Sequence, residues 1–228
     1  MRQRLFNWQG QRFVYLGLEA ETGPSPTQQA ERLFTRAGTA LESFGLSLAR
    51  NTVRTRIFGR TREARTAGSD VRTTVLTGAA RAAGSSYISP AHFASAADVA
   101  LDLFAMSAPA GGAARQVTEH APVQPFIRHL VWGPMVFLAG MTCEEHPTLA
   151  AQCRDILPRA GALLRETGCD WRNVIRVSMF LHRDQDPDVL LADIPTIAPL
   201  PLDNAEVELV DGFSRPGKLI EIEITARR

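Results

Sequence analysis

Apolar and polar positions along the chain follow two different periods, which predict strands and helices in turn. Short apolar runs at residues 5–8 and 13–18 lie on either side of Gln9-Gly10-Gln11, a pattern typical of a hairpin. The next apolar residues recur every three or four positions until Gly45, after a start at Ser25-Pro26 that has the form of a capping box. We therefore predict two strands followed by an amphipathic helix that covers a sheet.

The remaining apolar runs complete one structural unit. They predict a strand, a second helix and two more strands, at residues 53–58, 61–76, 85–89 and 99–106. The resulting order, β-β-α-β-α-β-β, is one that α+β domains use.

The whole series recurs about 122 residues later in the chain. One pair of corresponding segments is Arg36-Ala37-Gly38 and Arg159-Ala160-Gly161. Another is Arg50-Asn51-Thr52-Val53-Arg54 and Arg172-Asn173-Val174-Ile175-Arg176. The second series predicts elements at residues 127–132, 135–140, 148–168, 174–181, 205–210 and 218–225, with a short helix that begins at Asp186-Pro187. This lag is far longer than the repeat of about 20 to 50 residues in a solenoid, so we predict a duplicated domain.

The two predicted copies occupy residues 1–106 and 127–228. Residues 107–114 are small residues, proline and glycine, so we expect residues 107–126 to form a linker. Pro158 falls inside the second copy of the long helix, where it lacks the amide hydrogen for an interior bond. We expect it to kink that helix or to move its start.

Composition and charge restrict the class of protein further. Hydrophobic residues make up 45% of the 228 residues and charged residues 21%, as in a globular chain rather than a disordered one. The formal net charge of +1 gives no general reason to expect nucleic acid or an anionic membrane as a partner. We interpret the arginine-rich stretch Arg50–Arg72 as a solvated helix face and its flanks. The chain has neither a signal-peptide pattern nor a membrane-spanning apolar run, so we expect a cytoplasmic protein.

The cysteines and their neighbours suggest no metal or cofactor. Cys143, Cys153 and Cys169 are odd in number and all lie in the second half, which argues against a disulfide framework. Cys143-Glu144-Glu145-His146 contains residue types that bind metals, but its spacing matches no standard zinc pattern. We expect neither a metal site nor a cofactor.

The second half resembles the Rid family, the reactive-intermediate deaminases. The resemblance lies in Val136–Gly140, in Asn173–Phe180 and above all in the ending Lys218–Arg227, and it extends more weakly through the repeat to residues 5–106. It implies a mixed sheet backed by two helices in each copy, and ligand clefts between neighbouring units. It also implies imine or enamine hydrolysis, with an arginine before the penultimate strand that holds a carboxylate and a glutamate of the last strand that positions water.

Carried over residue by residue, the resemblance transfers only part of this machinery. Glu221 occupies the position of the glutamate, and its counterpart in the first copy is Ala100. Asn204 stands where the family has the arginine, and we place its first-copy counterpart at Gly84. Without that arginine, we do not expect efficient deamination of simple amino-acid-derived enamines.

The last strand places two carboxylates on one face. Glu221 alternates with the isoleucines of residues 220–224, so Glu221 and Glu223 share one face while the isoleucines face a core. If that face lines a cleft rather than solvent, burial and like-charge proximity should raise the pKa of one of them.

Three hypotheses about function follow. The first is a tandem Rid-like hydrolase or deaminase that acts on a small nitrogen-containing metabolite between the units, with Glu221 as catalytic residue and Asn204, Arg215, Ser85 and Tyr87 as substrate-binding residues. The second is a non-catalytic small-molecule binder or regulatory relative. The third is a chorismatase-like hydrolase, because chorismatases also carry Rid-like domains. For all three we expect a homo-oligomer, with three chains favoured, because two units per chain cannot complete a ring of three.

Overall fold

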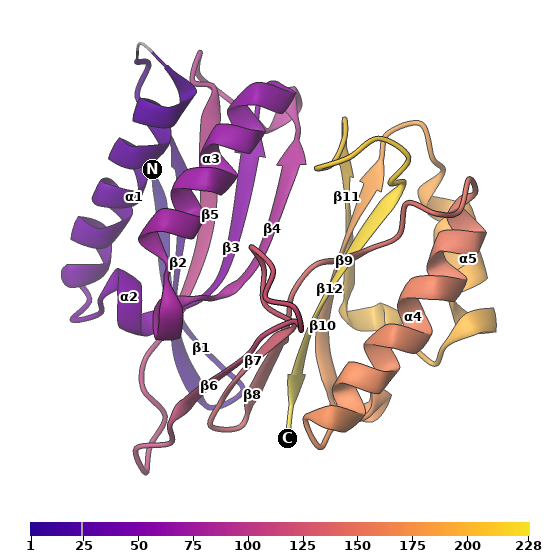
Figure 1. Ribbon diagram of the computed structural model, residues 1–228. Coiled ribbons are helices and arrows are strands. Elements are labelled where there is room, and N and C mark those ends of the chain that lie inside the picture. Colours follow the sequence, from indigo (N-terminus) through magenta and orange to yellow (C-terminus); the bar gives the residue numbers. More distant parts are fainter. Residues whose placement is uncertain (24) are drawn as a thin grey trace.

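The computed structural model describes residues 1–23 and 25–228 and contains two sheets, each with helices on one face (Figure 1). The first sheet has the strand order β1-β2-β5-β3-β4. Its unit consists of β1 (Arg2–Trp8), β2 (Gln11–Glu19), α1 (Pro26–Glu42), α2 (Leu48–Asn51), β3 (Thr52–Gly59), α3 (Arg62–Val75), η1 (Gly78–Ala80), β4 (Ala83–Ile88), η2 (Pro90–His92) and β5 (Val99–Met106).

The second sheet repeats this arrangement, with the order β7-β8-β12-β10-β11. Its unit consists of β6 (Arg115–Thr118), β7 (His129–Trp132), β8 (Met135–Leu138), β9 (Met141–Thr142), α4 (Leu149–Glu166), η3 (Trp171–Asn173), β10 (Val174–His182), α5 (Pro187–Ile197), η4 (Leu202–Asn204), β11 (Ala205–Val210) and β12 (Ile220–Arg227). The two α+β units predicted from the repeat are confirmed.

Two features differ from the expected outline. Part of the segment 107–126 forms β6, which extends the second sheet beyond β7, so this connection also belongs to the second sheet. The helix α4 runs through Pro158 without interruption and starts at Leu149. Its start is fixed by the Thr148 hydroxyl, which accepts a hydrogen bond from the Ala151 amide at 3.3 Å.

The strands have the same register in both units. Phe58 of β3 pairs with Ala100 of β5, and Phe180 of β10 pairs with Glu221 of β12, so Ala100 is the structural counterpart of Glu221, as expected. The counterpart of Asn204 is not Gly84. The parallel pairs Thr55–Gly84 and Val177–Ala205 make Gly84 equivalent to Ala205, which places the counterpart of Asn204 at Ala83.

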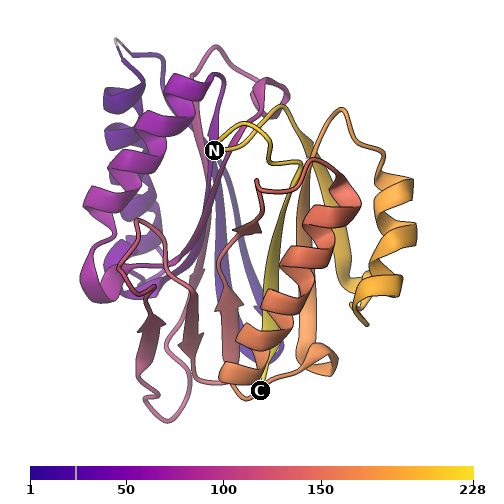
Figure 2. The ribbon, with the colours of Figure 1, turned by 45° about the vertical axis from the view of Figure 1, so that its right-hand side comes forward.

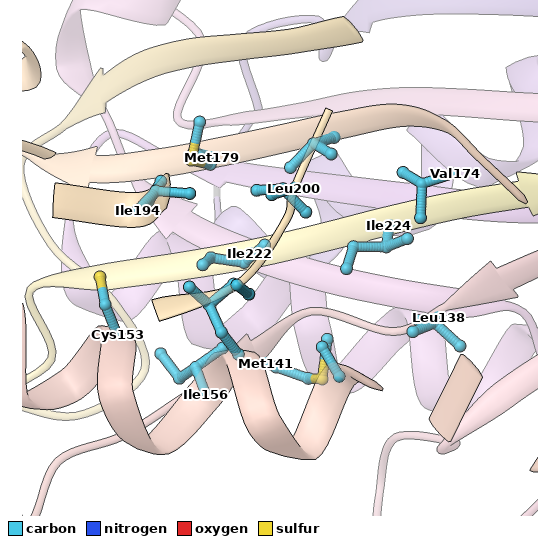
Figure 3. Packing of buried hydrophobic residues seen from close by; sticks show 14 of the residues in the cluster. Leu138, Met141, Cys153, Ile156, Val174, Met179, Ile194, Leu200, Ile222 and Ile224 are labelled. Atoms are coloured by element: carbon cyan, nitrogen blue, oxygen red, sulfur yellow. The ribbon is translucent and has the colours of Figure 1, made fainter. Parts of the chain in front are cut away.

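The helices lie on the two outer sides of the molecule and the two sheets face each other between them (Figures 1 and 2). In the second unit, the isoleucines of β12 pack under the helices, where Ile222 and Ile224 share a core with Ile156 of α4 and Ile194 of α5 (Figure 3). The opposite face of β12 is therefore turned toward the first unit. Burying these apolar faces is the dominant favourable contribution to folding.

Aromatic clusters join the two units. One contains Phe58 and Tyr87 of the first unit with Phe180 and Phe213 of the second, and the Tyr87 and Phe180 rings stack at 3.9 Å. A backbone bridge between Ile88 and Gly212 ties the sheets together beside it. The polar residues that face this interface make up the candidate site. No helix in the described part of the chain is long and apolar enough to cross a membrane.

Candidate functional site

Glu221 lies at the centre of the interface between the units. Its side chain comes from β12, is only 7% exposed and accepts a hydrogen bond from the Tyr87 hydroxyl at 3.3 Å. Gly140 leaves room for the carboxylate, because a Cβ atom there would stand 1.8 Å from Glu221 Oε1. The absence of a side chain at this position is therefore required for the observed placement of Glu221.

Glu223, two residues along the same strand, forms a buried ion pair with the first unit. Its Oε2 accepts bonds from Arg56 Nε at 3.0 Å and Nη2 at 2.7 Å, and lies 3.0 Å from Arg54 Nη1. The Ser85 hydroxyl donates to Oε1 at 2.5 Å, and the Tyr87 hydroxyl lies 3.4 Å from the same oxygen. Tyr87 thus connects the two carboxyl groups.

These surroundings drive the two pKa values apart. Burial, together with the negative charge of Glu223, raises the pKa of Glu221 from 4.5 to about 7. Burial alone would also raise the pKa of Glu223, but the guanidinium groups of Arg56 and Arg54 outweigh it and lower that pKa to about 2. The expectation that one carboxyl of the pair has a raised pKa is confirmed. Near neutral pH, Glu223 is therefore ionised, whereas Glu221 is partly protonated.

The two arginines do not share Glu223 equally. Burial lowers the pKa of both guanidinium groups, but the charge of Glu223 reverses this for Arg56, whose pKa is raised, and not for Arg54, whose pKa is lowered. The hydrogen bonds agree with this difference, since Arg56 donates two to Glu223 while Arg54 donates to the backbone oxygens of Leu138 and Ile224. We infer that Arg56 is the main partner.

Three further cations stand near Glu221 without an ion-pair partner among the described residues. Arg72 of α3 is 8% exposed and donates to the Ser85 backbone oxygen at 2.8 Å, and burial lowers its pKa to about 10. Arg65 donates to the Ser86 hydroxyl at 2.9 Å, and Lys218 donates to a serine hydroxyl. Lys218 and Arg65 each act to lower the pKa of Glu221, so their charges act on this carboxyl. The cluster favours an anionic ligand.

The structure brings together only some of the predicted site residues. Ser85 and Tyr87 contact the Glu221–Glu223 pair directly. Asn204 is exposed at the end of η4, and the next residue, Ala205, pairs with Val177 rather than with Phe180, the neighbour of Glu221. Arg215 is 72% exposed in its side chain and pairs with Glu144 at 2.7 Å. We therefore assign neither Asn204 nor Arg215 to the contacts of Glu221.

The arginines of the site correct the sequence interpretation of Arg50–Arg72. Arg54 and Arg56 belong to a strand whose side chains are all buried, not to a solvated helix face. Their alternation with Val53, Thr55 and Ile57 was a signal for one strand face. Arg72 lies on a helix, but its guanidinium reaches under Gly84, where a Cβ atom would stand 2.8 Å from Nη1. Only the packed structure shows this contact.

Two residues of the Cys143–His146 segment lie close to a third possible metal ligand, Asp155, which the sequence did not single out. Ligand atoms of Cys143, His146 and Asp155 all lie within 4.8 Å of one another. Asp155 already pairs with Arg159 of the same helix, and a structural zinc site uses four ligands. We assign no metal to these three residues.

Comparisons with known proteins agree with this architecture. No family model matches the chain. A RutC family protein from Synechocystis sp. is 32% identical over 74 residues, which span 29% of this chain and 57% of that protein. The crystal structure of a chorismatase covers 97% of this chain and 78% of its own, with a TM-score of 0.65 and 16% identity. A YjgF/YER057c/UK114 family member from Mycobacterium tuberculosis covers 50% of this chain and 100% of its own, with a TM-score of 0.40 and 22% identity.

The sequence match and the fold point to the same class of protein. A segment of the chain resembles a RutC family protein, and the chain has two Rid-like units in tandem, an arrangement that it shares in fold with the chorismatase. The chain spans 57% of the length of the RutC family protein and 78% of that of the chorismatase.

Proposed function

We propose that this protein is a hydrolase of a small anionic metabolite, in which Glu221 acts as a proton donor between the two units. The observation that carries the proposal is a buried carboxyl with a pKa of about 7, hydrogen-bonded to Tyr87 and set among Arg65, Arg72 and Lys218. A general acid works best when its pKa lies near the working pH. The surrounding cations favour a substrate with at least one carboxylate.

The reaction that fits this arrangement best is hydrolysis of an enol ether on an unsaturated ring acid, as in chorismate. Glu221 would give its proton to the terminal carbon of the enol, and water would then add to the cation so formed. The hemiketal would break its C–O bond, with the proton passing to the leaving oxygen, and release a 2-oxo acid and an alcohol. The fold shared with a chorismatase over 97% of the chain supports this choice.

Deamination of a nitrogen-containing metabolite is the second candidate, because Glu221 stands at the position of the Rid-family glutamate. What this candidate lacks is the family arginine that would bind the carboxylate of the substrate. Asn204 replaces the family arginine, and Arg72 is the one buried guanidinium near Glu221 that no carboxylate neutralises among the described residues. A non-catalytic binder would keep the cations and need no particular pKa at Glu221.

One experiment separates these functions. We expect the purified protein to release a 2-oxo acid from chorismate, and to leave 2-aminoacrylate-type imines at the uncatalysed rate. The 2-oxo acid is measured with a coupled dehydrogenase, and ammonia release from the imine is measured in parallel. Ammonia release without action on chorismate would favour the deaminase, and no turnover of either would favour the binder.

The packing of Gly140 against Glu221 gives a test that leaves the acid itself in place. Gly140→Ala should reduce turnover by about tenfold or more, because the added methyl group displaces the carboxylate from Tyr87. The backbone at Gly140 does not need a positive φ, so the effect arises from contact with Glu221. Initial rates measure the effect.

Gly38→Ala is the matched control for that change. Gly38 lies inside α1, and a Cβ atom there meets nothing within 4 Å. This variant should keep full activity and gain roughly 0.5–1 kcal/mol of stability, as glycine-to-alanine changes inside helices do. Equal rates for both variants would contradict the assigned role of Gly140.

The expected homo-oligomer remains a proposal. We propose that three chains associate, since each supplies two units and a closed ring needs three. Light scattering should then give about three times the chain mass of 24.9 kDa. A single-chain mass at micromolar concentration would contradict the closed assembly and leave each active site within one chain.

A further inference from the structure

A cavity lies between the sheets, on the side of Glu223 that faces β1 and β2. Its volume is about 130 Å³, and Glu221 and Tyr87 are not among the residues that line it. Its walls carry five aromatic rings from both units: Phe6, Trp8, Phe13, Phe104 and Phe137. The rings of Phe6 and Phe13 stack at 5.7 Å, and Phe13 meets Phe137 edge-on at 6.4 Å. Such walls suit a flat apolar ring.

Three arginines line the same cavity. Arg54 and Arg56 are 4% and 6% exposed, and Arg176 lies at its rim with a side chain that is 34% exposed. The carboxylates that neutralise them are Glu223, which serves both Arg54 and Arg56, and Glu206, which pairs with Arg176. Two carboxylates thus form ion pairs with the three guanidinium groups, and a third, Asp102, lies opposite Arg56 in the β3–β5 register and accepts a hydrogen bond from the Tyr15 hydroxyl.

Arg54 is the arginine whose bonding is incomplete. Its Nη2 donates to two backbone oxygens, but its Nη1 is buried without a hydrogen bond of good geometry, although it lies 3.0 Å from Glu223. Buried polar atoms in folded proteins almost always have a partner. A ligand oxygen in the cavity would supply one.

The aromatic wall and the arginines come together at Phe104. The guanidinium groups of Arg56 and Arg176 lie 5.5 Å and 5.9 Å from the centre of its ring. A carboxylate near these groups would therefore carry its ring against the aromatic wall. The size sets a limit, because an apolar cavity of about 150 Å³ binds benzene. The present cavity, at about 130 Å³, is slightly smaller and leaves room for no more than one six-membered ring.

We propose that this cavity binds a monocarboxylate carried on one unsaturated six-membered ring. The site is separate from the hydrolytic function proposed at Glu221 and goes beyond it. An access path exists, since Phe6, Arg56, Phe104 and Arg176 also line a larger open groove of about 780 Å³ on the surface. The guanidinium groups in the lining, with the unbonded Arg54 Nη1 among them, select for the carboxylate, and the cavity volume selects against larger ring systems.

Benzoate is the probe for this site, with benzyl alcohol as a neutral molecule of the same ring. We expect titration calorimetry to show benzoate binding with a sub-millimolar dissociation constant and benzyl alcohol to bind at least ten times more weakly, because a charge-assisted hydrogen bond is worth about 1.5–3 kcal/mol. Benzoate should also change the tryptophan fluorescence, and Trp8→Phe should remove that change, since Trp8 is the tryptophan in the lining.

Arg176→Gln tests the charge without unpairing a buried group, because its partner Glu206 is 64% exposed. We expect benzoate affinity to fall about tenfold or more. Arg172→Gln is the matched control, as Arg172 is a 91% exposed arginine that pairs with Asp170 on the surface. It should bind benzoate as the parent does, and thermal melting should show both variants folded.

Three results with the parent protein and the arginine variants would overturn the proposal. They are the absence of benzoate binding at millimolar concentration, equal affinity for benzyl alcohol, and equal affinity loss in the two arginine variants. Glu221→Gln distinguishes this site from the hydrolytic one, because it should bind benzoate unchanged. Benzoate binding abolished by Glu221→Gln would place the ligand at Glu221 instead and refute a separate site.

Discussion

Glu223→Gln should cost about 3–5 kcal/mol of folding free energy, because it removes the charge from one side of a buried ion pair. Arg56 and Arg54 would remain buried at 6% and 4% exposure, with only a neutral oxygen to face them. Buried guanidinium groups cannot lose their charge at ordinary pH, so they cannot relieve the cost by deprotonation. Chemical denaturation monitored by circular dichroism measures the loss.

Glu206→Gln is the control for that loss. It removes the carboxylate from the pair with Arg176, whose side chain is 34% exposed while that of Glu206 is 64% exposed. Exposed pairs contribute about 0–1 kcal/mol, so the expected change is small. Equal losses in the two variants would show that burial does not set the strength of the Glu223 pair.

Glu223 also predicts acid sensitivity. Its pKa is lowered from 4.5 to about 2 in the folded protein, so its contribution to stability is complete above pH 4.5 and is lost as the pH falls through 2. Glu221 acts in the opposite direction. Its pKa is raised to about 7, so the folded state holds this proton more tightly, and stability declines as the pH rises from 4.5 through 7.

Glu221→Gln should lower turnover strongly and yet stabilise the protein at pH 8. The shift from 4.5 to about 7 corresponds to roughly 3 kcal/mol of stability that the parent protein lacks at high pH. Glutamine is neutral at every pH, so the variant should escape this decline. Turnover should fall by about 10²–10⁴, the usual contribution of a general acid. Unfolding free energies at pH 4 and pH 8, with initial rates, give both results.

The pH profile supplies an independent readout. A proton donor with a pKa of about 7 loses its active form as the pH rises, so the parent rate should fall tenfold per pH unit above neutrality. A rate that rises through pH 7 would instead identify Glu221 as a base, which suits imine hydrolysis better. Parallel stability curves for the parent and Glu221→Gln would contradict the buried, proton-binding role altogether.

The two units and most of their elements could be predicted from the amino-acid sequence alone. The repeat fixed the equivalence of Ala100 and Glu221, and the cap at Ser25 and the stop at Gly45 bounded the first long helix. Period-two alternation in the last strand put Glu221 and Glu223 on one face, opposite the isoleucines. These features are local, because caps depend on residues within one turn and alternation depends on the geometry of a single strand.

The groups that contact those two carboxylates depend instead on how the two units pack. Arg54 and Arg56 lie about 170 residues from Glu223 in the sequence and reach it because two sheets pack face to face. That packing places Ser85 and Tyr87 at the site and leaves Asn204 and Arg215 outside it. It also sets the pKa values, because the dielectric and the distance between charges depend on how deeply the units bury each other. No period or motif along the chain carries that information.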